Sequence, residues 1–122
     1  KRAVLLPVSA LFHSSLIRSA ADRLAARLAE IDFQPPTIPV VNNVDVAIEI
    51  DPAKIKDALV RQAYSPVRWV ETMQKIATMD VTSVAECGPG KVLSGLVKRC
   101  ADSLTGIALA DLASIEANIS LE

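Results

Sequence analysis

The residue with the clearest capacity for chemistry is His13, the only histidine among the 122 residues. It lies in the segment SALFHSSLI, between an apolar run typical of a strand and a stretch with helical periodicity. In open α/β sheets, functional residues gather where strands end. A helix N-terminus near the ring would favour neutral imidazole, the form that a general base needs. Two interpretations remain open on these residues alone: a general base, or a loop histidine hydrogen-bonded to the backbone.

A histidine base needs a nucleophile, and the sequence offers no recognisable one. The Gly-x-Ser-x-Gly elbow that exposes a serine hydroxyl is absent. Ser14 and Ser15 lie too close to His13 in sequence to be presumed its partner, and Ser94 lacks the elbow. If His13 is a base, we expect its nucleophile to lie outside these residues.

Three further segments offer polar or charged groups, each with a structural interpretation beside the functional one. Gly88-Pro89-Gly90 either binds an anion through free backbone N–H groups or connects a strand tightly to a helix. Its spacing matches neither the P-loop motif nor the dinucleotide-binding fingerprint. Asn42-Asn43 is either a polar site or a turn. Lys98-Arg99 falls late in a predicted helix, where cations oppose the helix dipole favourably, and is either a binding pair or a solvated helix face.

The elements that position these residues alternate between strands and helices, which predicts an α/β layer structure with some parallel sheet. Apolar runs predict strands at 3–10, 81–87 and 107–110, and the 38–41 and 44–50 stretches have β-type patterns around the asparagine pair. Helical spacing predicts helices over 15–31 and 91–104, after Asp51-Pro52, after Ser65-Pro66 and after Asp111.

Composition narrows the functional class. A net charge of −1 and 3% aromatic residues give no general attraction to nucleic acid or to an anionic membrane, and no base-stacking platform. The apolar run near the start is too short to span a bilayer. Cys87 and Cys100 have no metal-ligand spacing, so we expect no metal site and interpret both as small buried hydrophobes of a reducing compartment. We therefore expect a cytoplasmic protein.

Four segments together resemble the C-terminal part of bacterial malonyl-CoA:acyl carrier protein transacylase, in the family's order and at plausible family spacing. They are LPVSALFHSSLI, PTIPVVNNVDV, ALVRQAYSPVRWVETM and VAECGPGKVLSGLVKR. The resemblance implies that this chain contributes to malonyl transfer from coenzyme A to the phosphopantetheine thiol of acyl carrier protein in fatty acid biosynthesis. It implies no permanently bound cofactor.

The resemblance also gives roles to individual residues. The family's catalytic histidine matches His13, and Ile17 takes the place of the methionine that the family usually has four positions after that histidine. A backbone carbonyl from an Arg-Gln pair takes the place of a triad carboxylate, which here implies the carbonyl of Gln62, 49 positions after His13. Such a carbonyl accepts from Nδ1–H and leaves Nε2 free to take a proton. Because that contact is main-chain, we expect little effect from Gln62→Ala.

Two more positions follow from the resemblance. Phe12 takes the place of an aromatic residue that accompanies malonyl selectivity in related acyltransferases, by filling the space of an extra methyl group. Lys98 and Arg99 match a basic pair on the face that docks the acidic carrier protein, where opposite charge steers association.

The implied fold is the C-terminal part of an α/β-hydrolase-like core, over 11–122, preceded by the last strand of a ferredoxin-like small subdomain, over 1–10. The family's serine elbow, oxyanion-hole glutamine and malonyl-binding arginine have no counterpart here, so we expect the isolated chain to be inactive and to self-associate or exchange elements through exposed apolar surface. The alternative is a catalytically inert module that only docks the carrier protein, or a structural remnant.

Overall fold

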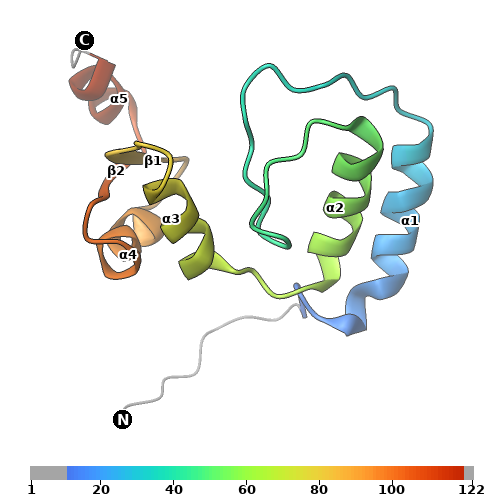
Figure 1. Ribbon diagram of the computed structural model, residues 1–122. Helices are drawn as coiled ribbons and strands as arrows, with labels where there is room; N and C mark the ends of the chain where they lie inside the picture. The colour runs from blue at the N-terminus through green and yellow to red at the C-terminus, as the bar shows by residue number, and fades with distance from the viewer. Residues whose placement is uncertain (1–10, 120–122) are drawn as a thin grey trace. The chain divides into compact units, whose positions relative to one another are not determined.

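The computed structural model describes residues 11–119, and the chain divides between Val67 and Arg68 into two compact units. We call them unit 1 and unit 2 (Figure 1). The predicted strand at 3–10, and with it the predicted small subdomain at 1–10, lies outside the described residues. The described part has five α-helices and a two-stranded parallel sheet, which confirms the α/β class.

Unit 1 is built on two long helices, α1 (Arg18–Ala29) and α2 (Pro52–Tyr64), which lie side by side and run in opposite directions (Figure 1). They bury small and medium apolar side chains, namely Ala21, Leu28 and Ala58. A short 3₁₀ turn, η1 (Ser15–Ile17), precedes α1. The single helix predicted over 15–31 is therefore a 3₁₀ turn followed by an α-helix.

The predicted start of α2 is confirmed. The Asp51 carboxylate accepts a hydrogen bond from the backbone N–H of Ala53 at 2.8 Å, and Pro52 occupies the first helical position, where no N–H partner is needed. The helix predicted after Ser65-Pro66 is also present, but it begins later than its signal, at Trp69, because Ser65 ends α2. The proline at 66 holds the preceding residue in extended backbone, so Ser65 adopts ψ 153° and the helix stops.

The segment between α1 and α2 forms no extended strand, contrary to the β-type pattern of its sequence. Its only ladder contact among the described residues is a single antiparallel bridge between Val41 and Ile48. The residues between them turn back sharply through Val46, which has φ +57°. We call residues 42–47 the asparagine loop.

Unit 2 contains α3 (Trp69–Ala77), β1 (Ser83–Cys87), α4 (Val92–Cys100), β2 (Thr105–Leu109) and α5 (Leu112–Ile119). The two strands are parallel, with Ser83 opposite Thr105 and Cys87 opposite Leu109. Their connection through α4 is the β-α-β unit that the alternating pattern predicted. The core is formed by Met73, Val97 and Leu104.

Gly106 allows α4 to lie directly on β2. A Cβ atom at this position would stand 2.2 Å from the backbone oxygen of Ser94, which is far inside van der Waals contact. Gly95, on α4 itself, has open space around it. The helix and strand thus approach each other at one residue that cannot carry a side chain.

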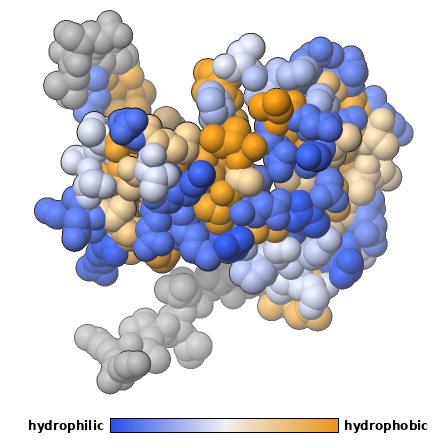
Figure 2. Space-filling model, in the orientation of Figure 1, coloured by the Kyte–Doolittle hydropathy of each residue, from blue (hydrophilic) through white to orange (hydrophobic). Residues whose placement is uncertain are grey.

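Apolar residues reach the surface of each unit (Figure 2). In unit 1, Ile38, Val40 and Ile50 expose 74%, 62% and 70% of their area. The prediction that both cysteines are buried is wrong for Cys87, which is exposed, while Cys100 is half-buried. No helix within 11–119 is long and apolar enough to cross a membrane.

Candidate functional site

His13 is held by the C-terminal end of α2. Its ring Nδ1 lies 3.1 Å from the backbone oxygen of Gln62, and its backbone N–H donates to the oxygen of Ala63 at 3.2 Å. The last four carbonyls of an α-helix have no partner within the helix. Two consecutive carbonyls of this kind are therefore satisfied by one residue that lies 49 positions earlier in the chain.

The backbone of His13 is in the left-handed region, with φ +56°. Histidine is among the few non-glycine residues that adopt this conformation with some frequency, yet it still costs about 1–3 kcal/mol. The turn is tightened by Ser14, whose hydroxyl donates to the oxygen of Leu11 at 2.7 Å. This conformation lets the N–H and the ring of His13 reach neighbouring carbonyls at the same time.

The contact with Gln62 determines which ring nitrogen of His13 carries the proton. A carbonyl oxygen only accepts, so Nδ1 must donate, and the neutral ring then has a lone pair on Nε2. The side chain is exposed, and Nε2 has no hydrogen-bond partner within residues 11–119. We expected the N-terminus of the following helix to act on the ring, but the ring contacts the opposite kind of helix end.

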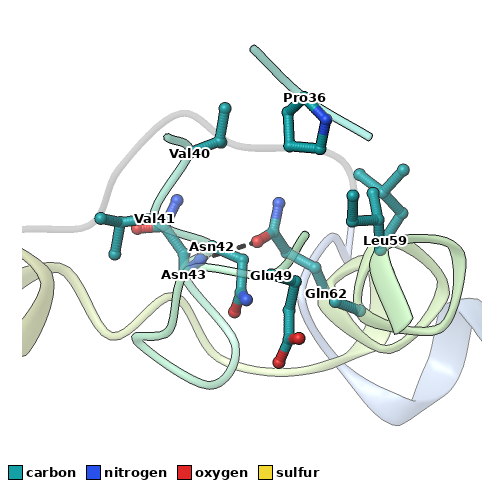
Figure 3. Close-up of a pocket in the computed structure, with 10 residues that line it drawn as sticks. Pro36, Val40, Val41, Asn42, Asn43, Glu49, Leu59 and Gln62 are labelled. Atoms are coloured by element: carbon teal, nitrogen blue, oxygen red, sulfur yellow. Dashed lines mark hydrogen bonds between the residues drawn. The ribbon is translucent and has the colours of Figure 1, made fainter. Parts of the chain in front are cut away.

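The side chain of Gln62 also has a partner. Its Oε1 accepts a hydrogen bond from the backbone N–H of Asn43 at 2.9 Å, as Figure 3 shows. Gln62 therefore joins the asparagine loop through its side chain and His13 through its main chain. The expectation that Gln62→Ala has little effect considered only the main-chain contact.

Arg61, one residue earlier, makes a second connection to the asparagine loop. Its two terminal nitrogens donate to the two carboxylate oxygens of Asp45, each at 2.7 Å, and its Nε donates to Asp57 one turn back on α2 at 2.7 Å. The hydrogen bonds that Arg61 donates to Asp45 and then to Asp57 raise its pKa above the already high usual value. The guanidinium is thus a permanent cation held in a planar, two-point contact.

The asparagine loop is itself well ordered by hydrogen bonds from Asn42. The side-chain Oδ1 of Asn42 accepts from the N–H of Asp45 at 2.7 Å, while Nδ2 and the backbone N–H both donate to the oxygen of Ala47 at 3.0 Å. Its backbone oxygen accepts from the N–H of Val46 at 3.1 Å. The Asn42-Asn43 pair therefore forms a turn, the structural one of its two interpretations.

A mostly apolar cavity of ≈ 290 Å³ lies between α2 and the segment that precedes it (Figure 3). Its lining includes Val40 and Leu59 as well as the polar Asn43 and Gln62. His13 and Phe12 do not line it. The cavity therefore lies beside the loop that supports His13 and does not itself contain the ring.

The other predicted site residues fall in both units. Phe12 precedes His13 in the sequence and exposes 68% of its area. Lys98 and Arg99 are in the last turn of α4, in unit 2, as predicted. Both are exposed, and neither forms an ion pair or a hydrogen bond with any residue in the 11–119 range.

The glycine turn before α4 already has an anion. The Glu86 carboxylate, on β1, accepts a hydrogen bond from the backbone N–H of Ser94 at 2.8 Å. This bond, together with those from the N–H groups of Leu93 and Val92, lowers the pKa of Glu86. Gly88 and Gly90 have φ values of +131° and +115°, which suits a tight strand-to-helix turn. The structure thus supports the connecting interpretation of this turn.

Comparison with known proteins gives the chain its relatives. It is 52% identical over 120 residues to the malonyl CoA-acyl carrier protein transacylase of Salmonella typhimurium, and 50% identical over 121 residues to that of Escherichia coli K12. The chain belongs to the malonyl CoA-acyl carrier protein transacylase family, as a C-terminal part of it. It spans 39% of the length of each of these two relatives. No protein-family model matches the chain.

Solved structures of transacylases agree with this assignment. The acyl-carrier-protein S-malonyltransferase of Burkholderia pseudomallei is 58% identical with a TM-score of 0.90, and 99% of this chain covers 39% of it. A malonyl-transacylase in complex with a type II polyketide-synthase acyl-carrier protein is 47% identical with a TM-score of 0.94; all of this chain covers 40% of it. The coarse architecture of the chain is therefore shared with its relatives.

Sequence reasoning missed two residues that organise these sites, Asp45 and Glu86. Asp45 lies 16 positions from its partner Arg61, and no local pattern signals that pairing. Glu86 stands eight residues before Ser94, on a strand whose alternation marks it only as a polar position. Both act through contacts that appear only when the chain is folded.

Proposed function

We propose that this chain supplies the general base for malonyl transfer, and that His13 is that base. The observation that carries the proposal is the hydrogen bond from His13 Nδ1 to the Gln62 carbonyl, because it leaves Nε2 as the acceptor on an exposed ring. A histidine with one nitrogen fixed and the other free is the usual partner of a serine or thiol nucleophile.

In the proposed reaction, Nε2 of His13 takes the proton of a serine hydroxyl as its oxygen attacks the thioester carbonyl of malonyl-CoA. The C–S bond breaks, the imidazolium returns the proton to the leaving thiolate, and free coenzyme A departs from a malonyl-serine. The carrier protein's phosphopantetheine thiol then gives its proton to Nε2, and its sulfur attacks the carbonyl of the malonyl-serine. The ester C–O bond breaks, malonyl leaves on the carrier thiol, and the imidazolium returns the proton to the serine oxygen. The serine lies outside these 122 residues, since the sequence has no Gly-x-Ser-x-Gly elbow.

The fold proposal follows from the same family. Residues 11–122 would form the C-terminal part of an α/β-hydrolase-like core, and 1–10 the last strand of a ferredoxin-like subdomain. The parallel β1–β2 pair connected through α4 supports the first half of this statement, because such units build α/β cores. In that core, exposed Phe12 beside His13 would limit the acyl pocket to unbranched malonyl.

Acyl carrier protein is the proposed partner, and Lys98 and Arg99 its proposed contacts. Their exposure and the absence of a partner for either within the described residues support this, because an acidic protein would find both cations available. One solved relative is described as a complex between a malonyl-transacylase and an acyl-carrier protein. Malonyl-CoA is the proposed donor, with no permanently bound cofactor.

The test is a malonyl-transfer assay on a complete enzyme in which these 122 residues replace the corresponding part of the Escherichia coli relative. His13→Ala should lower the rate of transfer to carrier protein about 10⁴-fold or more. Gln62→Glu, which keeps the main-chain carbonyl, should retain most activity. Near-normal transfer by the His13→Ala enzyme would reject the proposed base.

The isolated chain has a second candidate function, that of an inert carrier-docking module. It is favoured by the coexistence of an exposed basic pair with a sequence that lacks a serine elbow. A titration of acyl carrier protein against the chain tests it, with Lys98→Glu and Arg99→Glu as comparison variants. Binding that both variants weaken, without transfer, supports docking; the absence of binding leaves only a structural remnant.

A further inference from the structure

The connection between α2 and the asparagine loop has a consequence for His13. Arg61 and Gln62 both bind this loop with their side chains, while the oxygens of Gln62 and Ala63 bind His13. Three consecutive residues in the last turn of α2 thus face two partners. Terminal helical turns fray when their end groups lack fixed contacts.

The loop is suited to hold that turn in place. Asn42 gives it four internal hydrogen bonds, and Val46 is kept at φ +57°, a conformation that a β-branched residue adopts only when its surroundings enforce it. The loop is therefore a rigid support for the end of α2.

Asp45 provides the strongest single contact between the loop and the helix. Both of its carboxylate oxygens accept from Arg61 at 2.7 Å, and the side chains of the pair are only 35% and 33% exposed. A two-point arginine–carboxylate contact fixes orientation as well as distance. Asp57, on the same helix, also accepts a hydrogen bond from Arg61, so the guanidinium group has little conformational freedom.

We propose that Asp45 and Arg61 are positioning residues for His13: their ion pair fixes the last turn of α2, so that its carbonyls keep the imidazole in the Nδ1–H tautomer. The contacts run from the Asp45 carboxylate to Arg61, and then through the adjoining Gln62 carbonyl to the ring of His13. The role of this positioning in catalysis rests on the proposed function. Its structural content concerns only the ring and is tested without substrate.

The experiment measures the tautomer of His13 by nitrogen-15 NMR of the imidazole in the whole chain, at a pH where imidazole is neutral. The single histidine makes the signals unambiguous. Wild type should show mainly Nδ1–H. Asp45→Asn removes the charge while keeping the shape, and should lower the ratio of Nδ1–H to Nε2–H about fivefold, the change expected on losing one average hydrogen bond.

Asp51→Ala is the matched control, because it weakens the same helix at its other end by removing the N-cap. It should leave the tautomer ratio unchanged. Asp45→Glu retains a carboxylate and should restore most of the ratio. If Asp45→Asn does not fold, Arg61→Lys, which keeps the cation and loses the planar fork, serves in its place and should also lower the ratio.

An unchanged ratio in Asp45→Asn or its replacement would overturn the proposal, as would an equal change in Asp51→Ala, which would reduce the ion pair to general stabilisation. A normal tautomer response in a chain that proves to have no role in malonyl transfer would reject the proposed function and leave the positioning intact. The two failures are therefore distinguishable.

Discussion

The C-terminal end of α2 and the N-terminal end of α4 use the same property of helices to opposite effect. Each end leaves backbone groups without partners inside the helix. At α2 the free carbonyls hold His13, a side chain with a second nitrogen that still faces outward. At α4 the free N–H groups are taken by Glu86 from the same unit. One helix end therefore orients a side chain whose second nitrogen faces outward, whereas the other forms an internal joint.

The difference lies in whether the bound side chain keeps a second functional atom. An imidazole that donates through Nδ1 keeps a basic atom at Nε2, so binding orients it without using it up. The carboxylate of Glu86, in contrast, directs its negative charge at the N-terminus of α4. A helix end therefore presents a functional atom only when the side chain that it binds has a second one, and at α4 the N–H groups are bound by Glu86.

The largest effect should come from disrupting the close approach of α4 to β2, which places the N-terminus of α4 at Glu86. Gly106→Ala places a Cβ where only 2.2 Å is available to the Ser94 oxygen, so α4 must move off β2. We expect a loss of about 3 kcal/mol in the free energy of unfolding of unit 2. Urea unfolding followed by the fluorescence of Trp69, the only tryptophan, measures it.

Gly95→Ala is the control for that substitution, because open space surrounds Gly95 in α4. It should stabilise unit 2 by about 0.5–1 kcal/mol, since alanine favours helix over glycine. Equal effects from the two variants would show that the close approach at Gly106 is not what positions α4.

At α2, Gln62→Ala should cost about 1 kcal/mol, the net value of one hydrogen bond, because it leaves the Asn43 N–H without its partner. Amide exchange of Asn43 is the measurement, and it should become about fivefold faster. Gln62→Glu keeps an oxygen acceptor and should exchange close to wild type. A wild-type rate in Gln62→Ala would restore the simpler expectation that only the main chain of this residue matters.

At α4, the internal joint should be sensitive to acid. Because folding lowers the pKa of Glu86, its contribution is complete above the ordinary carboxyl value of about 4.3 and is lost as the pH falls through the folded value. The Ser94 amide should therefore exchange faster in Glu86→Gln than in wild type at neutral pH, and the two rates should converge as the pH falls through the lowered pKa of Glu86. A constant difference across this range would contradict the charge-based joint.

The smallest effect should come from the end of α1, where Arg27 and Glu30 pair with side chains 72% and 67% exposed. Glu30→Gln should change unfolding by at most about 0.5 kcal/mol, because water and salt screen such a pair. Urea unfolding monitored by circular dichroism provides the comparison. A cost as large as that of Gln62→Ala would show that exposed ion pairs also secure helix ends in this chain.

Local signals explain how much of this fold was predictable. The Asp51-Pro52 start and the β1–α4–β2 alternation depend on neighbouring residues, and both were predicted correctly. A turn at Asn42-Asn43 was one of two interpretations, but the strand-like pattern of 44–50 was misleading, because this loop makes its hydrogen bonds to Arg61 and Gln62. Those contacts span 16 and 19 positions, beyond the reach of periodicity.

The candidate site divides in the same way. That His13 is a candidate base could be argued from its type and place, but its pairing with Gln62 came only through family resemblance, since 49 positions separate the two residues. The ion pair of Asp45 and Arg61 and the carboxylate of Glu86 at α4 had no local signature at all. Residues that hold a site in place depend on tertiary contacts more than the residues that carry its chemistry.

The central claim is that the end of α2 fixes His13 with Nδ1 protonated and Nε2 free. Nitrogen-15 NMR of the single imidazole in the wild-type chain tests it most directly, at a pH where the ring is neutral. We expect a dominant Nδ1–H tautomer, the reverse of the preference of free histidine side chains. A dominant Nε2–H tautomer would contradict it.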